Sequence, residues 1–141
     1  MTNAVLTFAE RLKAETRTTH DSVDHLVMSV KPFDDKENYV KFLNLQSVFH
    51  KIVDDIYKNP VLNQAIPDLA SMARYDAVVQ DLRDLGHEVY VYAGELPQPQ
   101  DNKAVGWLYC AEGSNLGAAF LFKDAKEKLN FDENFGARHL D

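Results

Sequence analysis

The sequence of 141 residues has a single cysteine, Cys110, which excludes a framework of disulfide bonds and a metal cluster held by cysteines. We expect Cys110 to be a small apolar residue of the core and the chain to be cytoplasmic. A charge-free run of transmembrane length is also missing, because the one apolar stretch that is long enough contains Glu112. A secretory signal is not expected either, since Glu10 and Arg11 come before any continuous apolar run.

Basic residues are scarce relative to acidic ones: 15 Lys and Arg stand against 22 Asp and Glu, and the net charge is −7. Binding to nucleic acid requires a basic surface, and an anionic membrane repels a negatively charged protein. We therefore expect neither nucleic acid nor a membrane among the partners. The apolar content of 45% is typical of soluble globular proteins, and we expect residues 1–141 to form one domain with its own core.

Several motifs of well-defined chemistry are absent as well. A di-iron carboxylate bundle uses Glu-x-x-His pairs, and no glutamate here has a histidine three residues later. The His-Glu-x-x-His of zinc proteases, a phosphate-binding loop and Gly-x-Ser-x-Gly are also missing. Residues 113–117, GSNLG, resemble a dinucleotide-binding loop only superficially, because they lack a third glycine and lie inside a helical pattern.

Helical periodicity runs along most of the chain and predicts an all-α fold. Each of the first four expected helices is bounded by a capping residue, a proline or a glycine. The first covers about 7–29, and the second begins at the N-cap Asp34 with Glu37 as its capping-box partner. The third follows Asn59-Pro60, and the fourth runs from Pro67-Asp68 to Gly86. Residues 94–102 and the tail from 129 onward are expected to be loops. His87 and His139 fall in such turns and should be solvated, and the VYVY of 89–92 is too short to build a sheet.

The last expected helix, from about 104 to 128, has the most unusual composition. Its first twenty residues, AVGWLYCAEGSNLGAAFLFK, are apolar on every side, which is typical of a helix buried in a core. Yet Gly113 and Gly117 lie one turn apart on one face and each destabilises a helix by about 0.5–1 kcal/mol relative to Ala. Ser114 and Asn115 between them compete for backbone hydrogen bonds. Either another helix packs closely on these small residues, or a flat, bulky group lies against the bare backbone.

His20 is the candidate ligand on the first helix, where it lies on the apolar face. A lone histidine in such a place can be a hydrogen-bonded core residue or a metal ligand. Lys13, seven residues earlier on the same side, is roughly 10 Å away along the axis, which is of the order of the distance from the iron of a haem to its propionates. His25 lies about 140° around the helix from His20, so the two cannot share a metal.

Three more polar side chains lie near the expected apolar faces. Gln46 and His50 are one turn apart beside the apolar stripe of the second helix, and Arg74 is close to that of the fourth. They could be unrelated positions at the edge of the core, or they could hold ordered water in a cavity.

The segments LKAETRTTHDSVD (12–24) and GWLYCAEGSNLGAAFLF (106–122) resemble the haem oxygenase family, specifically its bacterial members of the Neisseria type. The similarity extends from Leu6 to the GARH near the end. It implies a helical fold that holds haem between a proximal helix and a kinked distal helix. The implied reaction is oxidative cleavage of haem to biliverdin, carbon monoxide and iron, with dioxygen and electrons from a reductase or ferredoxin. Haem is then both cofactor and substrate, and iron acquisition is the implied role.

The resemblance also implies roles for particular residues. His20 would be the proximal ligand of the iron, and Gly113 and Gly117 would be the glycines of the distal helix. Lys13 and Tyr109 match residues that contact the haem propionates. The remaining matches surround the distal ligand and its water network: Gln46, His50, Arg74, Ser114 and Asn115.

The sequence departs from the family pattern in two ways. Mammalian-type members carry an aspartate where Ser114 stands, which shifts the expected anchoring of the water network to His50, Arg74 and Asn115. Family members usually continue with further helices after the position of Asp141, so the resemblance implies C-terminal helices that this sequence lacks. Two other interpretations remain open: a non-catalytic haem carrier or sensor that uses His20, and a helical interaction module without a cofactor.

Overall fold

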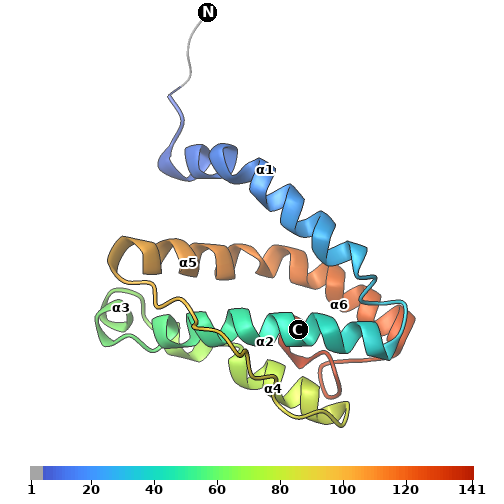
Figure 1. The fold of residues 1–141 in the computed structure, drawn as a ribbon. Helices are drawn as coiled ribbons and strands as arrows, with labels where there is room; N and C mark the ends of the chain where they lie inside the picture. The colour runs from blue at the N-terminus through green and yellow to red at the C-terminus, as the bar shows by residue number, and fades with distance from the viewer. Residues whose placement is uncertain (1–4) are drawn as a thin grey trace, which may run out of the picture.

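The computed structural model describes residues 5–141, apart from the side chain of Leu116. The helical elements, shown in Figure 1, are α1 (Phe8–Ser29), α2 (Lys36–Tyr57), α3 (Pro60–Ala65), the 3₁₀ helix η1 (Leu69–Met72), α4 (Tyr75–Asp84), α5 (Asp101–Gly113), α6 (Asn115–Leu129) and the 3₁₀ helix η2 (Arg138–Leu140). Across these residues the chain forms isolated β-bridges but no strand, so the all-α prediction is confirmed. The expectation about a signal peptide falls partly on residues 1–4, which lie outside the described residues.

Helix α2 is the central element of the core (Figure 1). Toward its N-terminal end Tyr39 and Leu43 belong to a cluster that includes Leu82 of α4 and Ala125 of α6. Toward its C-terminal end a second cluster joins α2 to η1 and α5. Burial of a large apolar side chain contributes about 1.5–3 kcal/mol, so these contacts fix α2, α4, α5 and α6 relative to one another.

The predicted start of α2 is wrong by one residue. Asp34 N–H donates to Lys31 O in the preceding turn, and it is Asp35 whose Oδ1 accepts the backbone N–H of Asn38 at 2.8 Å. The N-cap is therefore Asp35, which satisfies one of the unpaired donors of the first turn.

The predicted fourth helix is divided into two elements. Asp68 adopts a left-handed conformation with φ 63°, which stops a helix from continuing through it, and only the short η1 follows. Helix α4 begins later, with Arg74 as N-cap. Gly86, with φ 80°, follows its end as predicted, because glycine adopts the left-handed region without steric cost.

The helix predicted from about 104 to 128 is interrupted at Ser114, between α5 and α6. The Ser114 hydroxyl donates to Ala111 O at 2.7 Å, and such back-bonding by serine bends helices. The break falls between the two glycines where the sequence indicated a weak helix. Helix α5 also begins at Asp101, within the expected loop.

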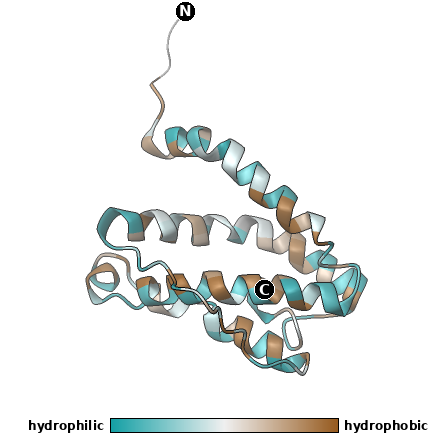
Figure 2. Cartoon of the chain, in the orientation of Figure 1, coloured by the Kyte–Doolittle hydropathy of each residue, from teal (hydrophilic) through white to brown (hydrophobic). Residues whose placement is uncertain are grey.

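The expectation that this stretch is buried on every side is wrong. Tyr109 is 48% exposed and Phe120 is 75% exposed, and Cys110 is exposed rather than part of the core. Helix α1 has no buried residue. Near its C-terminal end Val27 packs against the first cluster, and toward its N-terminal end the helix diverges from the other elements (Figure 1). Figure 2 shows hydrophobic residues along both α1 and the α5–α6 pair. Some of these apolar side chains, such as Phe120, lie on the surface, whereas others on α5, such as Leu108, are buried.

The tail after α6, predicted to be a loop, folds onto the core. Asp132 forms isolated bridges with Phe135 and Gly136, and Tyr39 OH donates to Gly136 O at 2.6 Å. His139, which was expected to be solvated, is 3% exposed. The expectation for His87 is confirmed, because that residue is exposed.

Candidate functional site

Helix α1 presents His20 at the surface. The helix begins with a capping box in which Thr7 Oγ1 accepts Glu10 N–H and Glu10 accepts Thr7 N–H. The side chain of His20 is 71% exposed, and its Nδ1 lies 3.2 Å from Asp24 Oδ2. This contrasts with the inward position that the sequence suggested. A carboxylate at Nδ1 fixes the ring and leaves Nε2 free, which is typical of histidines that ligate metals.

Asp24 is a functional candidate that the sequence analysis did not single out. The available signal was its spacing of four residues after His20, which places both side chains on one face of a helix. Lys13 lies two turns before His20 on the same helix and is exposed, with no ion pair to any described residue. Its ammonium group can therefore contact an anionic group of a ligand.

The glycines of α5 and α6 expose bare backbone. A Cβ atom added at Gly113 or at Gly117 would meet no atom within 4 Å, apart from the helix itself. The interpretation of these glycines as a site of close helix packing is therefore wrong. Tyr109, one turn before Gly113, is half exposed. This surface leaves room for a group that approaches the backbone closely.

His50 is a buried, uncharged histidine. Its ring is 7% exposed and lies edge-on to Phe49, with 5.4 Å between the ring centroids. Burial lowers the pKa of His50 from 6.5 to about 4, with further lowering by His139 and Arg74. Its Nδ1 is buried without a hydrogen-bond partner among the described residues. Gln46, one turn earlier on α2, is half-buried.

Arg74 lies close to His50 but donates its hydrogen bonds to the tail. Its Nη1 donates to His139 O at 2.8 Å and to Asp141 O at 3.1 Å. The guanidinium charge lowers the pKa of His50 and opposes the rise in the pKa of Tyr57, so it acts on two side chains of α2. His50 and Arg74 thus share a neighbour, His139, that the sequence did not indicate.

Asn115, at the start of α6, lies within a different hydrogen-bonded group. Its Nδ2 donates to Glu112 Oε2 at 3.1 Å, and Tyr57 OH donates to Glu112 Oε1 at 2.5 Å. Burial raises the pKa of Tyr57, and the hydrogen bond to Glu112 raises it further. In the sequence Glu112 was only the charge that interrupts an apolar stretch, and nothing local connects it with Tyr57. Ser114, exposed, lies between Glu112 and Asn115 at the helix break.

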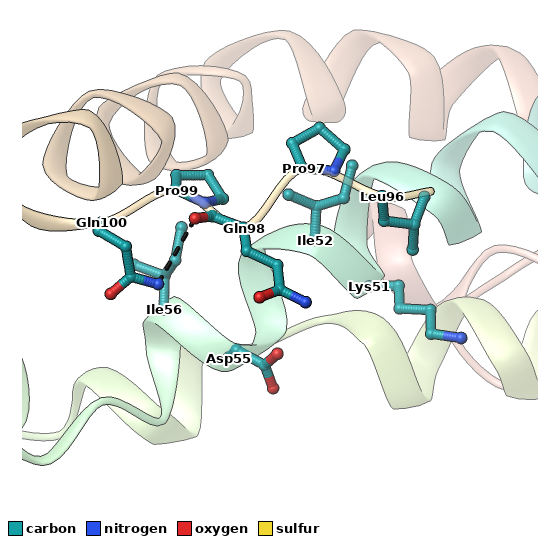
Figure 3. A pocket seen from close by; sticks show the side chains of 9 residues that line it. All are labelled: Lys51, Ile52, Asp55, Ile56, Leu96, Pro97, Gln98, Pro99 and Gln100. Atoms are coloured by element: carbon teal, nitrogen blue, oxygen red, sulfur yellow. Dashed lines mark hydrogen bonds between the residues drawn. The ribbon is translucent and has the colours of Figure 1, made fainter. Parts of the chain in front are cut away.

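A cavity of about 240 Å³ lies elsewhere, between the C-terminal half of α2 and the segment 96–100 (Figure 3). It is lined by Lys51, Ile52, Asp55, Ile56 and Leu96 to Gln100. Gln100 Nε2 donates to Gln98 O at 3.4 Å within this lining. None of the residues predicted for the site takes part, so the cavity is separate from it.

The predicted site residues thus form three groups: His20 with Lys13 on α1, the bare backbone of α5 and α6, and the polar side chains around α2. Exposed apolar side chains, bare backbone and a histidine with a free Nε2 suit a flat, largely apolar ligand that carries a metal ion. Within residues 5–141, none of the helices combines the length and apolarity needed to cross a bilayer.

Comparisons with known proteins point to one family. The model of the family described as heme oxygenase matches residues 6–141. A curated relative, "Heme oxygenase PigA" of Pseudomonas aeruginosa, is 43% identical over 137 residues, which cover 94% of this chain and 67% of the relative. The crystal structure of the NO- and CO-bound heme oxygenase from Neisseria meningitidis is 68% identical and superimposes with a TM-score of 0.92, over 96% of this chain and 68% of that one.

Proposed function

The chain belongs to the haem oxygenase family and is an oxidoreductase that degrades haem, and from this premise we propose which of its residues carry out the reaction. Haem is the substrate and dioxygen the co-substrate. The proposed products are biliverdin, carbon monoxide and iron. The observation that carries the assignment of the site is the open backbone at Gly113 and Gly117, because it supplies a surface that a planar ring can approach closely.

His20 is the proposed iron ligand. Its exposed ring and the contact of Nδ1 with Asp24 support this role, since they leave Nε2 as the free nitrogen. When bound, haem supplies both the iron that activates dioxygen and the ring that is oxidised. A neutral histidine ligand suits this chemistry, because a thiolate ligand would favour cleavage of the O–O bond.

Gly113 and Gly117 are proposed to direct dioxygen toward the ring edge. Side chains at these positions would occupy space beside the ligand, whereas bare backbone leaves that space open. Ser114, at the break between α5 and α6, is proposed to contact the haem on the same side as the two glycines.

A water network held by Gln46, His50, Arg74 and Asn115 is proposed to deliver protons. His50 supports this role because it is neutral at pH 7 and its buried Nδ1 lacks a protein partner, which is the situation that an ordered water resolves. Such a network would supply protons to the site through water molecules rather than from a strongly acidic side chain.

Lys13 and Tyr109 are proposed to contact the propionates. Both side chains are exposed, and Lys13 makes no ion pair within the described part of the chain. An electron-donor protein, a reductase or a ferredoxin, completes the proposed partners. A cytoplasmic location and a role in iron acquisition are part of the proposal, and the location is supported by the single cysteine.

Haemin titration followed by an electron donor in air tests the proposal. We expect titration to shift the Soret band of haemin and, after addition of ascorbate in air, the band to disappear as biliverdin forms. His20→Ala should alter the spectrum of the complex and stop turnover, whereas His25→Ala, an exposed histidine on the same helix, should change neither. A Soret band that persists through reduction would indicate a carrier, an alternative that none of the comparisons supports.

A further inference from the structure

Glu112 connects the core of the protein with the break between α5 and α6. Both of its carboxylate oxygens accept hydrogen bonds, one from Tyr57 OH at 2.5 Å and one from Asn115 Nδ2 at 3.1 Å. Tyr57 is 2% exposed and belongs to the second core cluster with Leu108 and Ala111 of α5. The hydroxyl of Tyr57 is therefore held by packing, and it fixes the Glu112 carboxylate in turn.

The contact with Glu112 determines how the Asn115 amide is oriented. An asparagine amide has two nearly isosteric ends, and only its hydrogen bonds decide which end points where. Because Nδ2 donates to a carboxylate, Oδ1 is directed away from Glu112, and among the described residues no donor bonds to it. The same bond spans Ser114, so it also holds the last turn of α5 against the first turn of α6.

We propose that Tyr57 and Glu112 are positioning residues that hold the Asn115 amide with its carbonyl oxygen available to water at the haem site. This inference rests on the proposed function of Asn115. The charge of Arg74 acts on both Tyr57 and His50, and Arg74 also donates to the backbone oxygen of His139, whose ring lies 6.4 Å from that of His50. Neither Tyr57 nor Glu112 need contact haem for this role.

The first test needs no haem and follows the Asn115 side-chain amide by NMR. In the wild type we expect the Nδ2 proton that is bonded to Glu112 to be shifted downfield from its position in a free asparagine and to exchange slowly. Tyr57→Phe and Glu112→Ala should move this resonance toward that of a free asparagine amide and speed its exchange about tenfold. Glu112→Gln should retain much of the wild-type pattern, because its carbonyl oxygen can still accept from Asn115. Resonances that are unchanged in Glu112→Ala would overturn the proposal.

The second test measures turnover with a matched control. Tyr39→Phe also removes a buried tyrosine hydroxyl from α2, but that hydroxyl donates to Gly136 in the tail. We expect Tyr57→Phe to lower kcat about tenfold with haem affinity unchanged, and Tyr39→Phe to leave kcat within about twofold of the wild type. The double variant Tyr57→Phe/Asn115→Ala should be no slower than Asn115→Ala alone, because both changes remove the contribution of the correctly oriented Asn115 amide.

The outcomes separate this inference from the function on which it rests. Losses that multiply in the double variant, or equal losses in Tyr57→Phe and Tyr39→Phe, would overturn the positioning role. If Tyr57→Phe does not fold, the comparison of Glu112→Ala with Glu112→Gln decides the question, since Glu112 is only half-buried. Absence of haem turnover by the wild type would overturn the proposed function, and the amide resonances then decide the proposal on the pair by themselves.

Discussion

Asp81 and His139 form a buried pair although they are 58 positions apart in the sequence. Asp81 Oδ2 lies 2.5 Å from His139 Nδ1 and accepts the backbone N–H of His139 at 3.1 Å, while its Oδ1 accepts that of Arg138 at 2.8 Å. The pair attaches the tail to α4 and places His139 beside His50, with 6.4 Å between the ring centroids. The position of His139 beside His50 in the proposed site thus depends on the Asp81 carboxylate.

Replacement of Asp81 should therefore destabilise the protein strongly. Asp81→Ala leaves the backbone N–H groups of Arg138 and His139 and the buried Nδ1 of His139 without this partner, and loss of one member of a buried pair costs about 3–5 kcal/mol. The measurement is urea unfolding at pH 7, in which the dependence of the free energy of unfolding on urea concentration is also compared between variants. Asp76→Ala, at an exposed position on the same helix, is the control and should cost less than about 1 kcal/mol. Equal losses in the two variants would contradict the structural role of Asp81.

His50 should make the stability depend on pH in the acidic range. Its pKa is lowered from 6.5 to about 4 in the folded protein, by burial first and then by His139 and Arg74. Between these two values the unfolded chain binds a proton that the folded chain does not, so the free energy of unfolding decreases as the pH falls. Thermal unfolding at pH 7 and at pH 5 should show a smaller drop in Tm for His50→Gln than for the wild type. The same drop in both proteins would be inconsistent with a depressed pKa.

Gly113→Ala should separate folding from catalysis. The added methyl meets open space in the protein alone, so we expect a folded variant that gains about 0.4–1 kcal/mol from the less flexible unfolded chain. It should bind haem yet lose biliverdin formation, because the methyl group occupies the space proposed for dioxygen. Gly106→Ala, also in α5 and also facing open space, is the control and should retain turnover. Normal turnover by Gly113→Ala would disprove the steering role.

The double variant Lys13→Asn/Tyr109→Phe should change which meso carbon is cleaved. The propionates are the charged groups by which the ring is oriented, and a difference of about 1.4 kcal/mol between two orientations already gives tenfold selectivity. An exposed ion pair supplies about 0–1 kcal/mol, so both contacts must be removed together. We expect mixed biliverdin isomers at similar total yield, in place of the single isomer expected from the wild type. Tyr92→Phe, a similarly exposed tyrosine, is the control, and chromatography of the product is the measurement.

The sequence by itself determined that the chain is helical, the position of several helix ends, and the family. Apolar periodicity and end signals are local, and they correctly indicated α1 with Thr7 at its start and the end of α4 before Gly86. Motifs such as GSNLG are also local, which is why the family could be identified before any contact was known. Even the weak point of the last helix was visible, because glycine and serine destabilise a helix wherever they occur.

Only the tertiary structure decided which side chains are buried and what they contact. The apolar α5–α6 face was expected in the core, yet its Phe120 is exposed, since no described element packs on it. The reverse holds for His139, which is buried because Asp81 on another helix supplies its partner. Glu112 is likewise held by a distant residue, since its carboxylate accepts a hydrogen bond from Tyr57, which is 55 positions away in the sequence. Periodicity shows which face of a helix is apolar, but whether that face or a neighbouring polar group finds a partner depends on segments that are distant in sequence.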